Sequence, residues 1–502
     1  MEIGFEYRDV LIQRFDQNTW DNFRNNLQVI LKRDEAYFLV RQDQTQKPVI
    51  QAAPASKIHA AAPAFAVAGQ TLDIRFSILD AYNNPAFPSP VGNFQVAEVR
   101  DPFECIGSTA LEPKDGGSGT IPVQAPNEPG RYRFIISDTK DSLQGRTQIV
   151  QVGSVREDGI FFGDIHAKTG LSDGLGTPDQ YYRHLRDHAC MDFGAISDHH
   201  DTPAINRTEG PFKRVMTDEE FGSIRDAGEK FNQPGRFITL QGFEQTYLSD
   251  FPGHRNVYFR GGMPEMFRGI TIKDFMEYLE GKEALVIPHH TLYGNRLKPD
   301  FPYIDRFRVI EMYSMHLSSE KRGSPYNDGK PEIGYSAQEV LAQGHRVGFI
   351  AASDNHNGKP GLSAKPSRFV NLVFSGGLAA VYAPELTREA VYDALYRRCC
   401  YATTGERIIL DFKVNGSRMG SEIHIKAGEK VELEVFCGGT GEIACIEILK
   451  DNQVVKVFQD GFSSMLEVRM EEMLTRSCQY YIRVTQTDRH MAWSSPVWVD
   501  IE

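Results

Sequence analysis

Length, composition and charge describe an ordinary globular chain and exclude several classes of protein. The 502 residues predict about three domains at roughly 150 residues each. Hydrophobic residues at 41% and charged residues at 24% exclude disorder as the main state. The net charge of −12 and the lack of a basic tract argue against a nucleic-acid partner, because binding to phosphates requires clustered Lys and Arg. The longest small apolar run, residues 60–69, is too short to span a bilayer, so no membrane partner is expected.

The N-terminus and the cysteines predict a cytoplasmic location. The first residues show no basic segment followed by an apolar one, so we expect no secretory signal. The seven cysteines contain no Cys-x-x-Cys pair, which argues against a zinc site made of cysteines. We expect them to be reduced thiols.

Residues 1–155 predict a polar N-terminal segment followed by a β-sandwich-like domain. One helix is expected over residues 18–31. From residue 61 onward, short alternating runs such as 71–78 and 130–137 are separated by Pro, Gly and Asn clusters, which is typical of antiparallel strands.

Residues 156–405 alternate apolar, strand-like runs with helix starts. Seven runs begin near residues 160, 192, 236, 284, 307, 347 and 378. Capping threonines at positions 177, 217 and 271 each predict the start of a helix. This alternation predicts an α/β fold in which parallel strands are joined by crossover helices, and the number of units favours a barrel over an open sheet. Strand-like runs return at 431–436, 443–449 and 480–485, so residues 406–502 predict a second small β-domain.

Histidines and carboxylates gather at the predicted strand ends of the middle domain. In α/β barrels, the residues at the carboxyl ends of the strands meet at one face. Mixed imidazole and carboxylate ligands suit zinc, manganese or iron, whereas calcium prefers oxygen ligands alone. Residues i and i+2 of a strand share a face, so several of these side chains should project into one site. The candidates in chain order are Asp164, His166, Asp173, Asp198, His199, His200, Glu244, His254, His289, His290, Glu311, His316, Asp354 and His356.

The same segments resemble the motifs of PHP (polymerase and histidinol phosphatase) domains. Residues 163–174 read Gly-Asp-Ile-His-Ala-Lys-Thr-Gly-Leu-Ser-Asp-Gly and residues 195–199 read Ala-Ile-Ser-Asp-His, similar to the family pattern D-L-H-x-H-T-x-x-S-D-G followed by T-D-H. Later segments also fit, among them Gln-Gly-Phe-Glu at 241–244, Val-Ile-Pro-His-His at 286–290 and Ala-Ser-Asp-Asn-His at 352–356. Residues 386–395 and 401–405 look like a multidomain branch that is similar to carbamate-ester (carbaryl-type) hydrolases. The resemblance covers residues 155–502.

This resemblance implies a distorted (β/α)7 barrel, flanked here by N- and C-terminal β-sandwich-like domains, with up to three metal ions. The implied ligand sets are His166, Glu244 and Asp354; Glu244, His254 and His289; and Asp173, His199 and His356. Glu244 would bridge the first two ions.

Lys168 departs from the family pattern, which has a second histidine at this position. A protonated lysine cannot ligate a metal ion, so we expect about two ions per chain, zinc or manganese, with iron as a further candidate. Three roles stay open for Lys168: pairing with a carboxylate, holding a substrate oxyanion, or becoming carboxylated and itself a ligand.

The neighbours of the presumed ligands also have open roles. For His200 and His290, general acid catalysis competes with packing or ligand orientation. Glu311 either orients a ligand or is one. The residues expected to orient ligands or contact substrate are Asp164, Asp198, Glu311, Tyr313 and His316, the last two with a plain surface position as the alternative.

Three functions compete. The first is a metal-dependent hydrolase that uses a metal-activated water on an ester, carbamate or amide bond of a small-molecule substrate, with a metal ion or Lys168 stabilising the oxyanion. The second is a phosphoesterase of the PHP type, and the third is a non-catalytic, metal-containing binding protein. Loss of part of one metal site favours the first, because three clustered metals suit phosphoryl oxygens. Formation of a homo-oligomer stays open.

Overall fold

The computed structural model describes most of the chain, and its first elements form a hairpin. Strand β1 (Val29–Arg33) pairs antiparallel with β2 (Ala36–Val40). The helix predicted over residues 18–31 is therefore wrong for residues 29–31, and its remainder lies outside the described residues. The described ranges are 29–33, 36–40, 54–81, 83–86, 92–98, 105–111, 116–138, 143–155, 158–200, 215–248, 252–293, 303–324, 326–327, 332–362, 376–459 and 463–502.

Residues 57–153 form a sandwich of small sheets, ordered β3-β5-β8, β11-β10-β6-β7 and β4-β12-β9. The strands are β3 (Lys57–Ala61), β4 (Phe65–Val67), β5 (Thr71–Leu79), β6 (Gly92–Glu98), β7 (Cys105–Leu111), β8 (Ser118–Gln124), β9 (Gly130–Tyr132), β10 (Phe134–Asp138), β11 (Gln144–Arg146) and β12 (Val150–Gly153). Along β5, Leu72, Ile74 and Phe76 are buried while Asp73 is exposed, so one face of the strand points into a core. The ring centre of Phe76 lies 4.9 Å from that of Phe94 in the next sheet. The predicted β-sandwich-like character is confirmed.

Residues 159–403 alternate short strands with helices. The strands are β13 (Gly159–Asp164), β14 (Phe193–Gly194), β15 (Ile238–Thr239), β16 (Gln241–Tyr247), β17 (Pro252–Phe259), β18 (Ala284–Pro288), β19 (Val309–Tyr313), β20 (Gly348–Ala351), β21 (Leu378–Ala383) and β22 (Cys400–Thr403). The helices are α2 (Pro178–Arg183), the π-helix η2 (His184–His188), α3 (Asp218–Phe231), α4 (Ile272–Leu279), the 3-10 helix η3 (Ile304–Arg306), α5 (Ala337–Ala342) and α6 (Arg388–Tyr396). The predicted helix starts are confirmed: Thr177, Thr217 and Thr271 cap α2, α3 and α4 with capping boxes. None of the helices in the described ranges has the length and apolar character needed to cross a membrane.

The (β/α)7 barrel predicted from the sequence is wrong, because strand makes up 44% and helix 14% of the described residues. The predicted strand runs do not form one ring of parallel strands. Strands β13, β14 and β15 pair in parallel, and β19 pairs in parallel with β20 in a separate sheet. Strands β16, β17 and β18 form an antiparallel sheet, although α4 lies between β17 and β18. An apolar run between helix signals thus predicts a buried strand but not the direction in which it pairs.

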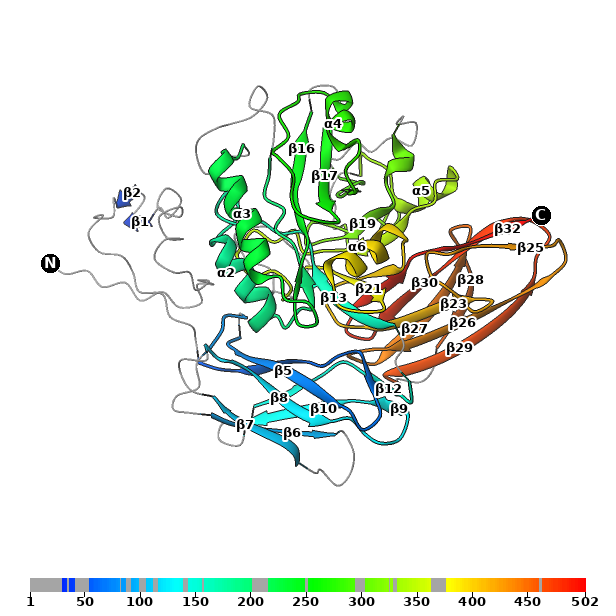
Figure 1. Cartoon of the computed structure of the whole chain (residues 1–502), viewed down its shortest axis with the longest axis horizontal. Coiled ribbons are helices and arrows are strands. Elements are labelled where there is room, and N and C mark those ends of the chain that lie inside the picture. Colours follow the sequence, from blue (N-terminus) through cyan, green and yellow to red (C-terminus); the bar gives the residue numbers. More distant parts are fainter. Residues whose placement is uncertain are drawn as a thin grey trace.

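The C-terminal strands are joined to the middle of the chain by a continuous sheet. They are β23 (Ile409–Val414), β24 (Ser417–Arg418), β25 (Glu422–Ile425), β26 (Lys430–Gly438), β27 (Ile443–Lys450), β28 (Gln453–Phe458), β29 (Met465–Met473), β30 (Cys478–Gln486), β31 (Met491–Ser494) and β32 (Val497–Ile501). Because β22 pairs with β31, the sheet runs β15-β14-β13-β21-β22-β31-β30-β27-β28, across the boundary predicted near residue 405. A second sheet, β24-β23-β26-β29, completes this orange and red part of the molecule (Figure 1).

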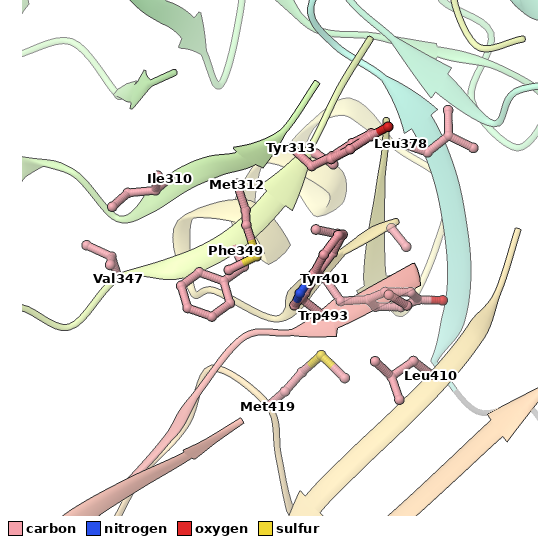
Figure 2. Packing of buried hydrophobic residues seen from close by; sticks show 14 of the residues in the cluster. Ile310, Met312, Tyr313, Val347, Phe349, Leu378, Tyr401, Leu410, Met419 and Trp493 are labelled. Carbon is pink, nitrogen blue, oxygen red and sulfur yellow. The ribbon is translucent and has the colours of Figure 1, made fainter. Parts of the chain in front are cut away.

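A buried core lies where this continuous sheet meets β19 and β20. The rings of Tyr313 and Trp493 stack with their centres 6.0 Å apart, and both residues are buried. Met312, Phe349 and Tyr401 belong to the same cluster (Figure 2). This packing anchors β19, whose carboxyl end leads into the candidate site.

Candidate metal centre

The candidate site lies beyond the carboxyl ends of strands in the middle of the chain. Just after β13, Ala167 forms an isolated parallel bridge with Asn355, which follows β20. A second parallel bridge joins His199, beyond β14, to Glu244 in β16. These bridges align the strand ends, so that histidines and carboxylates far apart in the sequence become neighbours.

Glu244 is the carboxylate at the centre of this cluster, and its side chain is buried. Its Oε1 lies 2.9 Å from His254 Nδ1, 3.2 Å from His199 Nδ1 and 3.5 Å from His289 Nε2. Its Oε2 lies 3.2 Å from His166 Nε2. The structure therefore brings four predicted ligand histidines to the carboxylate that was predicted to bridge two ions.

Asp354 is a second point at which histidines meet. Its Oδ1 lies 3.2 Å from His166 Nε2, while its Oδ2 lies 2.7 Å from His290 Nε2 and 3.1 Å from His316 Nε2. Asp354 and His290 both have a φ of +50°, in the left-handed region that residues other than glycine rarely adopt. Backbone strain of this kind gathers at functional sites, and here the two strained residues face each other.

The third predicted ligand set is also assembled. Asp173 Oδ2 lies 3.3 Å from His199 Nε2, and Asp173 Oδ1 lies 3.5 Å from His356 Nε2. The other ring nitrogen of His199 lies 2.5 Å from Thr246 Oγ1, which donates a hydrogen bond to Glu244 at 3.0 Å. Sequence reasoning missed Thr246, although positions 244 and 246 share one face of β16 and that spacing was the available signal.

Lys168 has the first of the three roles considered for it, pairing with a carboxylate. Its ammonium group forms an ion pair with Glu244 and donates a hydrogen bond to the carbonyl oxygen of Ser197 at 2.6 Å. The side chain is fully buried. Burial opposes the charged form, but Glu244 and Asp354 outweigh it and raise the pKa of Lys168 above its usual value. A cation of the protein itself thus stands beside Glu244.

Two predicted orienting residues fix the backbone of the site. Asp164 accepts hydrogen bonds from the backbone N–H of Ser353 at 2.9 Å and of Gly361 at 2.8 Å, at either side of the segment that carries the site residues 354 and 356. Asp198 accepts from the backbone N–H and the hydroxyl group of Thr169, at 2.9 and 2.6 Å. Both carboxylates therefore hold loops that position ligands.

At two of the histidines, nearby carboxylates raise the pKa more than burial lowers it. Burial alone would lower the pKa of His166, but Asp354 and Glu311 hold it well above its usual value, and Glu311 Oε2 lies 2.7 Å from His166 Nδ1. At His199, Glu244 in the same way overcomes burial and raises the pKa to about 9. A site that stabilises buried imidazolium rings also stabilises metal cations, which compete with protons for the same nitrogens.

Two predicted site residues lie outside the cluster. His200 Nε2 lies 2.8 Å from the carbonyl oxygen of Phe267, and its ring packs 5.7 Å from that of Phe243. The chain direction that turns His199 into the cluster sends His200 to the opposite side, so packing is its role. Tyr313 lies in the core below the site rather than among the ligands.

The donor atoms fit divalent transition metals. Two atoms bound to one ion at about 2.1 Å lie roughly 3.0 to 3.4 Å apart in octahedral or tetrahedral geometry, close to the contacts above. Asp354 Oδ1 is buried and accepts no hydrogen bond within the described part of the chain. Four triads of donor atoms lie within 4.8 Å of one another: His254, His289 and His290; His166, His289 and Asp354; Asp173, His199 and His356; and His290, His316 and Asp354. The third triad is the set that the sequence resemblance implies.

Comparisons with known proteins match the chain to relatives whose function is not described. Residues 363–424 match a family described as "Protein of unknown function (DUF3604)". An uncharacterized protein of Chlamydia trachomatis is 26% identical over 479 residues, which cover 88% of this chain and 73% of that protein. An uncharacterized protein of Chlamydia pneumoniae is 25% identical over 495 residues, covering 89% and 74%.

Likeness to solved structures is weak. A cycloisomaltooligosaccharide glucanotransferase from Paenibacillus sp. aligns with 88% of this chain and 72% of its own, at 9% identity and a TM-score of 0.25. A likeness at this level carries no argument about fold or function.

Proposed function

We propose that the chain is a metal-dependent hydrolase that cleaves an ester, carbamate or amide bond of a small molecule. The observation that carries the proposal is the convergence of histidines and carboxylates, from segments spread over residues 166–356, at mutual distances of 2.7–3.5 Å. A fold needs no such buried cluster for stability, because each buried charge is costly to desolvate. The resemblance of the same segments to PHP-domain metallohydrolases of the carbamate-ester branch supports this class.

Bound zinc or manganese ions would supply Lewis acidity, polarising a carbonyl group and activating water. The histidines of the site differ in how deeply their side chains are buried, and this difference suggests different roles. His166 and His289 have fully buried side chains and would hold the innermost positions. His316 and His356, with side chains 26% and 32% exposed, lie on the side from which a substrate would approach. Lys168, with a fully buried side chain, compensates the charge of Glu244.

The test is an assay of metal-stripped and metal-loaded chain against aryl esters, aryl carbamates, anilides and aryl phosphates. We expect turnover of at least one carboxyl-type substrate that appears with zinc or manganese and disappears on chelation. Asp354→Asn should abolish it, whereas His424→Ala, at an exposed histidine in β25, should not. Turnover of phosphates alone would establish the phosphoesterase alternative. Full metal content without turnover of any substrate would establish the binding protein. The predicted cytoplasmic location remains part of the proposal.

A further inference from the structure

Four histidine and carboxylate triads share several members, and this sharing limits how they can be filled. A neutral histidine gives a metal ion one nitrogen, so His289 and His290 can each serve one ion, whereas the two oxygens of a carboxylate can serve two. The triad His254, His289 and His290 therefore excludes both triads that contain Asp354. The remaining three triads are compatible, since no histidine belongs to two of them and Asp354 is the one residue that two of them share.

The two oxygens of Asp354 already face different histidines. Oδ1 lies next to His166, and Oδ2 lies between His290 and His316, whose ring centres are 4.6 Å apart. The ring centre of His289 lies 4.1 Å from that of His166, and these two histidines form a donor triad with Asp354. This division is the one that a carboxylate has when it bridges two ions.

Glu244 is less suited to that role here. Its Oε2 forms the buried ion pair with Lys168, whose positive charge raises the electrostatic cost of a divalent ion at that oxygen. Glu244 is also absent from the four donor triads found among the described residues. Lys168, where this sequence departs from the family pattern, thus forms an ion pair with Glu244, the carboxylate that the resemblance implies as the bridge.

We propose that His290, His316 and Asp354 hold a separate divalent ion, and that Asp354 bridges it to an ion held by His166 and His289. The proposal deepens the proposed function, on which it rests for the role of metal in hydrolysis. The two positions differ in access: the side chains of His290 and His316 are 11% and 26% exposed, and those of His166 and His289 are fully buried. The ion at His290 and His316 is the one that a substrate reaches first, and the inner ion is held away from water.

Manganese content and manganese electron paramagnetic resonance test this arrangement without reference to activity. Full-length chain is stripped, loaded with Mn²⁺ and desalted, and bound ions are counted by elemental analysis. Two ions bridged by a carboxylate at about 3.5–4 Å give an exchange-coupled spectrum. We expect His316→Ala to bind one ion fewer per chain than the wild type and to lose the coupled signal. His424→Ala, at a histidine with a 59% exposed side chain, should match the wild type in both measurements.

Three results would overturn the inference. The first is His316→Ala with wild-type manganese content and a coupled spectrum, since His290 and His316 would then be hydrogen-bond donors to Asp354 and nothing more. The second is loss of the coupled signal in Glu244→Gln, which would return the bridge to Glu244. The third is a wild-type chain that binds neither Mn²⁺ nor Zn²⁺, which would remove the proposed function as well. A coupled pair in a chain without turnover, by contrast, would support the site and reject the hydrolase.

Discussion

Replacing Lys168 with methionine removes the positive charge of a fully buried ion pair and keeps the length of the side chain. Glu244 would lose its cation and the carbonyl oxygen of Ser197 would lose its donor at 2.6 Å. Breaking a buried pair by removing one partner costs about 3–5 kcal/mol, because the remaining charge stays desolvated. We therefore expect Lys168→Met to lower the free energy of unfolding by about that amount in chelated protein. Mn²⁺ should restore most of the loss, since a divalent ion can then neutralise Glu244.

The assay is urea unfolding followed by circular dichroism, with and without chelator. Lys430→Met is the matched control: it removes an exposed Lys430–Glu471 pair of 2.8 Å, which water already screens, and should leave the midpoint unchanged. Loss of less than about 1 kcal/mol in chelated Lys168→Met would refute the reasoning, because the pair would then contribute no more than a surface contact. A loss of equal size with and without Mn²⁺ would show that no ion reaches Glu244.

The sequence predicts the members of the cluster better than the fold that assembles them. Alternation along strands and the order of the motifs bring out residues such as His166, Glu244 and Asp354, because local spacing decides which side of a strand a residue faces. Strand direction depends instead on pairing between distant segments, which leaves no local trace. The pattern of apolar runs therefore could not predict the antiparallel pairing of β16, β17 and β18.

His200 and His290, each preceded by a predicted ligand histidine, show where prediction of side-chain direction from the sequence fails. Extended backbone predicts that His200 and His290 both turn away from the ligands that precede them. This holds for His200, but the φ of +50° at His290 reverses its direction and places Nε2 at 2.7 Å from Asp354. A glycine in the sequence indicates where left-handed backbone can occur, but a histidine gives no such indication. The sequence therefore leaves the same two roles open for His200 and His290, and the backbone conformation separates them.

Two further predictions separate structural from functional groups. His200→Gln should keep the wild-type manganese content but lose about 1–3 kcal/mol of stability, because it loses a buried hydrogen bond. His199→Gln should instead bind one ion fewer than the wild type. Equal loss of metal in both variants would contradict the placement of His200 outside the cluster. Lys359, 4% exposed, should make stability depend on pH. Burial lowers its pKa from the usual 10.5 to about 8, partly offset by Asp80. Between those values the unfolded chain keeps a proton that the folded chain has lost, so stability should rise with pH by up to about 3 kcal/mol. Lys359→Met removes this titration, so urea unfolding should show the variant to be more stable than the wild type at pH 7, with the difference shrinking towards pH 10.5. A difference that stays constant over this range would mean that Lys359 titrates alike in the folded and unfolded chains.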